Sequence, residues 1–249
     1  MQTIDKYQDA NDKLRLLLQG SPGTGKTAMA CQLPGAYVID VDVNLGGALR
    51  FLKERGLHLP IGYDVLDRNE AGALVPMKER YQRLNTLLIA AQSNPLVETI
   101  IIDSATTFAD VLIAEVLRMQ GKEKMTKQEW GFFGNAGRHL FNVLASMRKH
   151  IVFIGHEKVN KNEDGSIAYP VKVAWPGQVG QNIGAFFTNV WRCEVERKTV
   201  AVAGQPGLSS EYHWWVRTMP DQQYELKNTL GLPALFKFDW KLIEEALAK

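Results

Sequence analysis

The octapeptide Gly20-Ser-Pro-Gly-Thr-Gly-Lys-Thr27 carries the strongest structural signal in the sequence. It matches the pattern G-x-x-x-x-G-K-[ST], whose glycines let successive backbone N–H groups wrap around phosphate groups. The pattern requires a strand before it and a helix after it. Leu14 to Leu18 reads as a buried strand, and Lys26 to Leu33 reads as a helix whose N-terminal dipole would attract an anion. We therefore predict a phosphate-binding loop at residues 20–27.

Each position of this loop has a predicted role toward a nucleoside triphosphate and its metal ion. Lys26 would reach the β- and γ-phosphates, and the Thr27 hydroxyl would bind Mg²⁺. The phosphate site would be lined by Gly20, Ser21, Pro22, Gly23, Thr24, Gly25, Lys26, Thr27 and Ala28. The predicted cofactors are therefore ATP and Mg²⁺.

Apolar runs alternate with helical patterns along most of the chain. Strands are expected at 37–43, 61–66, 98–102 and 151–154, and helices at 48–55, 77–92, 107–119 and 136–149. This alternation predicts an α/β fold, a mainly parallel twisted sheet with helices on both faces. A hairpin at 158–173 and strands at 188–196 and 211–217 predict added antiparallel edge strands.

Composition predicts one globular domain. The chain has 249 residues, of which 45% are hydrophobic and 22% are charged. We expect a single domain over 1–249, with an N-terminal extension at 1–12 and a C-terminal helix within 238–249. No apolar run approaches the length of a membrane span, and the N-terminus has no targeting pattern. We therefore expect no contact with a membrane. Cys31 and Cys193 lack metal or redox spacing, which predicts a reducing cytoplasm and no structural disulfide.

Polar residues stand where predicted strands end, which is where open α/β sheets bind ligands. Asp103 follows the apolar run at 99–102 and would hold Mg²⁺ through its water shell, with helix capping as the alternative. Asp40 and Asp42 share one face of a strand, and either would orient the attacking water unless both cap the next helix. His156 would sense the γ-phosphate, with an ordinary surface histidine as the alternative.

These features together resemble the RecA-like recombinase superfamily, and more closely its phage single-strand annealing ATPases. The matching residues are the phosphate loop, Ile39-Asp40-Val41-Asp42, Ile102-Asp103-Ser104 and His156, and the resemblance covers about residues 13 to 235. It implies a RecA-like core in which Asp42 stands for the family's catalytic glutamate and His156 for its sensing glutamine. The implied catalytic set is Lys26, Asp42, Asp103 and His156. RecA's large C-terminal domain has no counterpart in this sequence.

The resemblance also implies two DNA-binding loops, at about 121–134 and 158–180. They lie in or beside a section, Arg118 to Lys172, that contains ten basic and five acidic residues. Cations suit phosphates, and aromatic rings suit unpaired bases. Candidate contacts to single-stranded DNA are Lys122, Lys124, Lys127, Trp130, Lys158, Lys161, Lys172 and Trp175. The alternative for Trp130, Phe132 and Phe133 is a place in the core or at a subunit interface.

RecA-like ATPases complete their sites across a subunit interface. The resemblance therefore implies a homo-oligomer, either a ring or a filament. Arg217 and Lys227 are the candidates for trans-acting residues, with ordinary surface charge as the alternative. Expected partners are single-stranded DNA, further copies of the chain and a single-strand DNA-binding protein, in the bacterial host cytoplasm if the chain is phage-encoded.

The predicted function is slow, DNA-stimulated ATP hydrolysis coupled to annealing or strand exchange. Three alternatives remain open. A RecA-fold motor is weakened by the lack of a second domain, and a small-molecule kinase by the lack of an arginine-dense lid. A nucleotide-switched assembly protein without direct DNA activity is not separated from the first reading by the sequence.

Overall fold

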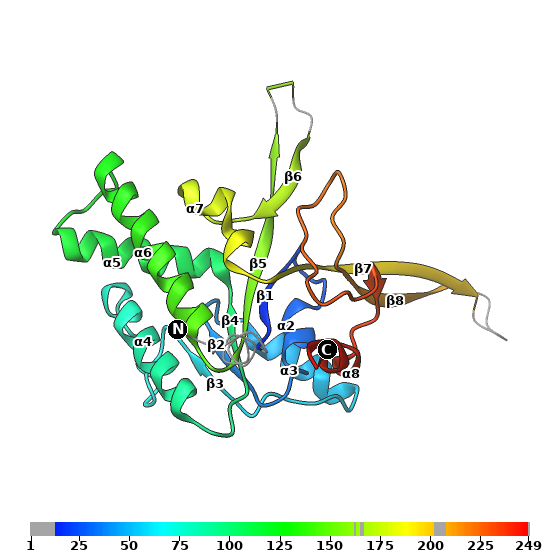
Figure 1. Ribbon diagram of the computed structural model, residues 1–249. Coiled ribbons are helices and arrows are strands. Elements are labelled where there is room, and N and C mark those ends of the chain that lie inside the picture. Colours follow the sequence, from blue (N-terminus) through cyan, green and yellow to red (C-terminus); the bar gives the residue numbers. More distant parts are fainter. Residues whose placement is uncertain (1–12, 162, 165–166, 202–207, 249) are drawn as a thin grey trace, which may run out of the picture.

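The computed structural model describes residues 13–161, 163–164, 167–201 and 208–248. Side chains at 159–161, 167–169, 200–201 and 208–210 lie outside that description, as does the predicted extension at 1–12. Within the described part, nine strands form one sheet in the order β3-β2-β4-β5-β1-β7-β8-β9, with β6 paired to β5 (Figure 1). The strands are β1 (Arg15–Gly20), β2 (Ala36–Asp40), β3 (Gly62–Val65), β4 (Thr99–Asp103), β5 (His150–Lys161), β6 (Ile167–Val173), β7 (Asn189–Ala201), β8 (Leu208–Arg217) and β9 (Leu235–Phe236).

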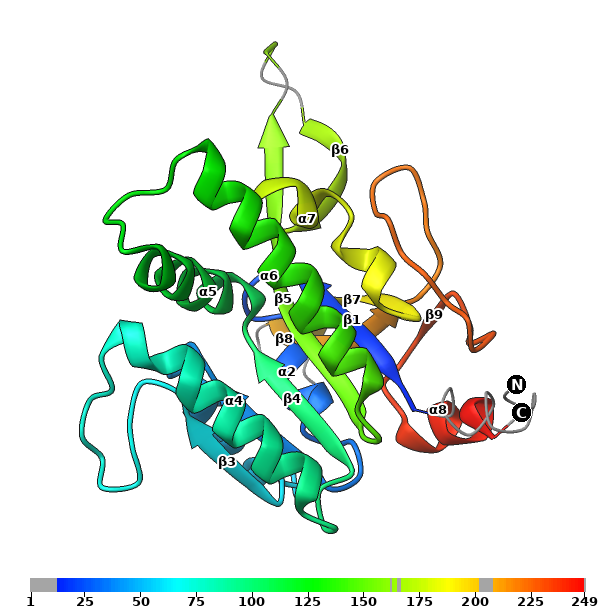
Figure 2. The same cartoon turned by 60° about the vertical axis from the view of Figure 1, so that its left-hand side comes forward.

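The helices cover both faces of this sheet. They are α2 (Lys26–Ala30), α3 (Leu45–Glu54), α4 (Met77–Ser93), α5 (Ala105–Gln120), α6 (Lys127–Ser146), α7 (Gly177–Gln181), the 3-10 helix η1 (Ile183–Phe186) and α8 (Trp240–Leu247). Figure 2 shows α4, α5 and α6 in front of the sheet. Alternation along β1 sends Leu17 into the core layer under these helices, and Leu16 and Leu18 into the layer under α2, α3 and α8.

Strand direction confirms the predicted fold class. The strands from β3 through β7 in the sheet order pair in parallel, whereas β8, β9 and β6 add antiparallel pairs at the edges. Asp40 is in register with Asp103, and Gly20 with His156. The carboxyl ends of β2, β4 and β1 therefore meet along one edge beside His156, beyond which β5 continues into the hairpin, and open parallel sheets bind ligands at such an edge.

Two boundaries differ from the sequence prediction in ways that affect the site. β2 ends at Asp40, so Asp42 lies in the following loop and does not share a strand face with Asp40. The DNA-binding loop expected at 121–134 is irregular only as far as Thr126, because α6 begins at Lys127. A capping box fixes that start: the Thr126 side chain accepts from Gln128 N, and Glu129 accepts from Thr126 N at 3.0 Å.

Two hairpins project from the body of the molecule. The β5–β6 hairpin confirms the one predicted at 158–173, although part of its tip lies outside the described residues. The β7–β8 hairpin is longer than predicted and forms an arm beyond the sheet (Figure 1). The turn predicted at 204–207 falls outside the described residues. Among the helices described, none is long and apolar enough to cross a membrane.

Candidate functional site

The loop between β1 and α2 is shaped by glycines that no other residue could replace without strain. Gly25 has φ +82°, and a side-chain carbon there would lie 2.9 Å from the Trp214 ring. A side-chain carbon at Gly20 would lie 2.7 Å from the carbonyl oxygen of Cys193. The loop is therefore held closely against β7 and β8, and α2 begins directly behind it at Lys26.

Lys26 is buried and bonded to its own loop. Its Nζ donates to the carbonyl oxygens of Gly20 and Ser21, both at 2.9 Å. Burial lowers the pKa of this ammonium, while nearby acidic groups, Cys193 and Asp103 foremost, oppose that shift. The Lys26 side chain thus lies inside the loop that the sequence predicts to hold phosphates.

Asp103 and Thr27 come together across the site. Thr27 Oγ1 donates to Asp103 Oδ2 at 2.5 Å. Burial, with a smaller contribution from the charges of Asp42 and Asp40, raises the pKa of Asp103 to about 6 against the effect of the Thr27 hydrogen bond. A hydroxyl and a carboxylate are hard oxygen donors, and Mg²⁺ uses one or two such protein groups together with water and substrate phosphates. The residues present fit Mg²⁺ bound with a nucleotide.

Among the described residues, no cluster of three or more histidine, cysteine or acidic side chains could hold a metal ion unaided.

Asp40 and Asp42 have different surroundings. Asp40 Oδ2 accepts from the backbone N–H of Asn44 at 3.1 Å and of Leu45 at 3.0 Å, so it caps the start of α3. Burial is the main cause that raises its pKa. Asp42 makes no such cap and lies beside His156, in the middle of β5. The capping interpretation therefore fits Asp40 and not Asp42.

Asp42 faces His156. The Asp42 Oδ2 atom lies 3.6 Å from His156 Nε2. Burial raises the pKa of this carboxyl, but interactions with His156, Thr107 and Ser104 outweigh burial, so the pKa lies below its usual value. Among the described residues, Asp42 Oδ1, His156 Nδ1 and Ser104 Oγ are buried without a hydrogen-bond partner. Buried polar atoms that lack partners fit a site that is completed by water or ligand oxygens.

A groove leads away from the phosphate loop on the α3 side. One cavity of about 280 Å³ is lined by Gly23, Thr27, Asp103 and His156 and reaches Phe51 and Trp214. A second, of about 320 Å³, continues past Phe51 and Trp214 to Arg55. The Arg55 guanidinium lies 4.4 Å from the centre of the Phe51 ring and 5.1 Å from that of Trp214. Sequence reasoning missed all three residues, which come from α3, from the position directly after it and from the distant strand β8.

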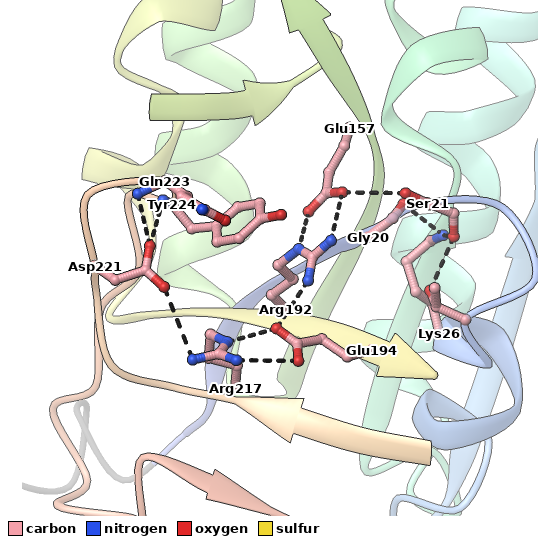
Figure 3. A network of polar contacts seen from close by, with 11 residues as sticks. Gly20, Ser21, Lys26, Glu157, Arg192, Glu194, Arg217, Asp221, Gln223 and Tyr224 are labelled. Atoms are coloured by element: carbon pink, nitrogen blue, oxygen red, sulfur yellow. Dashed lines mark hydrogen bonds and ion pairs between the residues drawn. The ribbon is translucent and has the colours of Figure 1, made fainter. Parts of the chain in front are cut away.

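A chain of ion pairs begins at the other side of the loop (Figure 3). Ser21 Oγ donates to Glu157 at 3.3 Å, and Glu157 pairs with Arg192. Arg192 also pairs with Glu194 at 2.8 Å, and Glu194 with Arg217. Glu157 and Arg192 were not predicted from the sequence, although Glu157 directly follows His156.

The two predicted trans-acting residues are engaged within their own chain. Arg217 pairs with Glu194 and lies 3.8 Å from Asp221. Lys227 Nζ donates to the carbonyl oxygen of Phe187 at 2.9 Å. A trans role for either side chain stays a prediction, and it requires that these contacts be exchanged.

The predicted DNA contacts divide into exposed, engaged and buried groups. Exposed side chains are those of Lys122, Lys124, Lys127, Trp130 and Lys158. Lys172 pairs with Glu225 at 3.1 Å and donates to the carbonyl oxygen of Gln181 at 2.8 Å. The Lys161 side chain lies outside the described part.

The prediction for Trp175 is wrong. Its ring is only 7% exposed and packs against Phe108 and Phe133, with ring centres 6.0 and 5.9 Å apart, so it cannot stack on a base. Phe133 is buried with it, as the core alternative proposed. Trp130 and Phe132 remain 40% and 38% exposed on α6.

The AAA domain family matches residues 12–230, which is most of the chain. Among solved structures, the KaiC-like protein PH0186 from Pyrococcus horikoshii OT3 is 15% identical, with 87% of this chain and 84% of that chain covered and a TM-score of 0.43. No curated protein matches significantly. With a phosphate loop, a paired Thr27 and Asp103 and a family match over most of its length, the chain belongs to the AAA domain family of P-loop ATPases.

Proposed function

We propose that this protein is a Mg²⁺-dependent ATPase that binds single-stranded DNA and promotes annealing or strand exchange. One observation carries the ATPase part: Thr27 and Asp103 are joined at 2.5 Å directly behind a glycine loop that encloses the Lys26 ammonium. This is the arrangement in which P-loop enzymes hold a metal-bound triphosphate. The annealing activity rests on the resemblance to phage annealing ATPases.

The side chains of the site have separable tasks. Lys26 would exchange its two carbonyl partners for phosphate oxygens, and the backbone N–H groups of the loop would bind the rest. Mg²⁺, when bound, would neutralise charge on the phosphates. Asp42 is ionised and lies beside His156, so it would accept a hydrogen bond from the attacking water and orient it. His156, on the same edge, would contact the terminal phosphate.

The groove beside the loop suits the base of the nucleotide. It begins at Thr27 and runs over Phe51 and Trp214, whose rings meet edge to face at 5.2 Å. Flat apolar rings provide stacking area for a purine, and Arg55 supplies a cation over the same surface. ATP would therefore lie with its phosphates at the loop and its base between α3 and β8.

Support for DNA binding comes from the turn between α5 and α6 and its neighbour α7. Three lysines, at 122, 124 and 127, are exposed there together with Trp130. A side-chain carbon at Gly177 would lie 3.8 Å from the Trp130 ring, so the segment after the β5–β6 hairpin lies against this corner. Both views place α7 beside α6 and that hairpin (Figure 1, Figure 2). Exposed cations and a ring on one corner suit a single strand.

The test is ATP hydrolysis with and without single-stranded DNA, in wild type and in Lys26→Ala. We expect Mg²⁺-dependent turnover that single-stranded DNA increases, and turnover near background in the variant. Wild-type protein without turnover would remove the ATPase proposal. If single-stranded DNA does not change the rate of ATP hydrolysis, and a filter or polarisation assay detects no DNA binding, a nucleotide-switched assembly protein would be favoured.

A further inference from the structure

Glu157 is a carboxylate beside a loop that receives anions. Its side chain is 5% exposed, and its Oε2 accepts from Ser21 Oγ at 3.3 Å. A buried negative charge this close to bound phosphates would repel them strongly, because little water screens the interaction. Something must therefore offset the charge of Glu157 in a working site.

Arg192 supplies the opposite charge in a fixed geometry. Its Nε and Nη2 meet the two oxygens of Glu157 at 2.6 and 3.2 Å. The guanidinium lies over the Tyr224 ring at 3.9 Å and also meets Glu194 at 2.8 Å. A two-point contact and a stacked ring fix the plane of the guanidinium, which a lysine could not reproduce.

The pair spans the strand that leads into the phosphate loop. Arg192 on β7 is in register with Gln19 of β1, and Gly20 is in register with His156, the residue before Glu157. Glu157 and Arg192 thus bond to each other from the two strands that flank the end of β1 (Figure 3). The first loop residue after β1, Ser21, bonds to this pair.

We propose that Glu157 and Arg192 form a positioning pair for the phosphate loop, in which Arg192 cancels the charge of Glu157 so that Glu157 can hold Ser21 without repelling the nucleotide. The inference rests on the proposed nucleotide binding and adds residues that are outside the loop itself. It has a distinctive consequence. Removal of Arg192 alone leaves a buried charge uncompensated, and that is more harmful than removal of both partners.

The experiment measures ATP affinity by calorimetry with Mg²⁺ present, in Arg192→Gln, Glu157→Gln and the double variant. We expect Arg192→Gln to weaken ATP binding about tenfold or more at low salt. The double variant should return to within about threefold of wild type, since the repelling charge is gone. ADP binding should lose less than ATP binding, because ADP carries less charge.

Arg83→Gln is the matched control. Arg83 pairs with Asp64 at 3.1 Å and is similarly shielded, at 17% exposure, but it joins α4 to β3 away from the loop. ATP affinity should be unchanged in it. If Arg192→Gln does not fold, as judged by its thermal transition, Arg192→Lys replaces it. Lysine keeps the positive charge but cannot make the two-point contact with Glu157, so Arg192→Lys should bind ATP more weakly than wild type.

Two results would overturn the inference. Unchanged ATP affinity in Arg192→Gln would show that the charge of Glu157 does not reach the phosphates. A double variant as weak as Arg192→Gln would assign the loss to structure and not to charge. Wild-type protein that binds no ATP would overturn the proposed function and this inference with it, whereas the first two results leave the proposed function intact.

Discussion

At the scale of single residues, the site separates two aspartates that the sequence could not distinguish. Asp40 caps α3 through two backbone N–H groups, whereas Asp42 lies 3.6 Å from His156 with one oxygen unpaired among the described residues. Asp42→Asn should therefore keep ATP binding and slow hydrolysis, because the amide keeps the shape but loses the charge that orients water. Hydrolysis rate and nucleotide affinity, measured on the same preparation, check this.

Asp40→Ala gives the complementary result. It should leave most turnover intact and lower the free energy of unfolding by about 0.5–2 kcal/mol, the usual range for a helix cap lost to alanine. Chemical denaturation of Asp40→Ala and Asp42→Asn side by side is the measurement. A slow Asp40→Ala with a normal Asp42→Asn would reverse the two roles.

The raised pKa of Asp103 makes the stability of the fold depend on pH. Its pKa is raised from 3.8 to about 6 in the folded chain, so the folded state holds this proton more tightly than the unfolded state does. Unfolding free energy contributed by this group therefore falls as pH rises from about 4 to about 6 and stays low above that. Asp103→Asn should raise the melting temperature of the nucleotide-free protein at pH 7 and not at pH 3.5, while it removes Mg²⁺-dependent turnover. Equal melting temperatures of wild type and Asp103→Asn at pH 7 would contradict the raised pKa of Asp103.

At the scale of elements, α6 determines which aromatic rings reach solvent. The helix starts at Lys127, so Trp130 and Phe133, three residues apart, lie on one face with ring centres 5.6 Å apart; Phe133 is in the core with Trp175, and Trp130 is at the exposed margin of that face. Trp175→Ala should cost about 3–5 kcal/mol of folding stability, as for other large core truncations. Trp130→Ala should cost less stability than Trp175→Ala, because the Trp130 ring is 40% exposed, and should weaken single-strand binding by about 1–3 kcal/mol. Denaturation curves and DNA titrations distinguish these two effects.

The lysines of the same corner predict a salt effect. A Lys122→Ala, Lys124→Ala variant should reduce the slope of log affinity against log salt by about 1.4, at roughly 0.7 per lost phosphate contact. The Trp130→Ala deficit should depend on salt far less. Identical slopes in wild type and the lysine variant would move the DNA site away from α6.

Contiguous patterns were predictable from the sequence, and pairs between distant strands were not. The phosphate loop, Asp103 and His156 each follow an apolar strand, so the parallel sheet itself brings them together. The start of α6 was predictable from Thr126 and Glu129 but was missed, because the resemblance placed a DNA-binding loop in that polar region. Trp214 and Arg192 reach the site from β8 and β7, and no local pattern marks strands that pair only after folding.

At the scale of the whole molecule, the resemblance predicts assembly, and Arg217 provides the test. Arg217 pairs with Glu194 in its own chain, so a trans role requires a neighbouring nucleotide to compete for it. If it does, an inactive Lys26→Ala chain mixed with an inactive Arg217→Ala chain should recover part of the hydrolysis. Light scattering with ATP and single-stranded DNA should then report a mass above one chain. A strict monomer, or no recovery on mixing, would restrict Arg217 to its intrachain role.

The contact of Lys26 with its own loop has a consequence for product release. Its two carbonyl partners, on Gly20 and Ser21, mimic the oxygens of a phosphate group. Nucleotide binding is thus an exchange reaction, in which each incoming oxygen displaces one that the protein already provides. When the product leaves, the ammonium is not left bare in a buried site, because the same carbonyls return to it. We expect this internal competition to favour release of the product after each turnover.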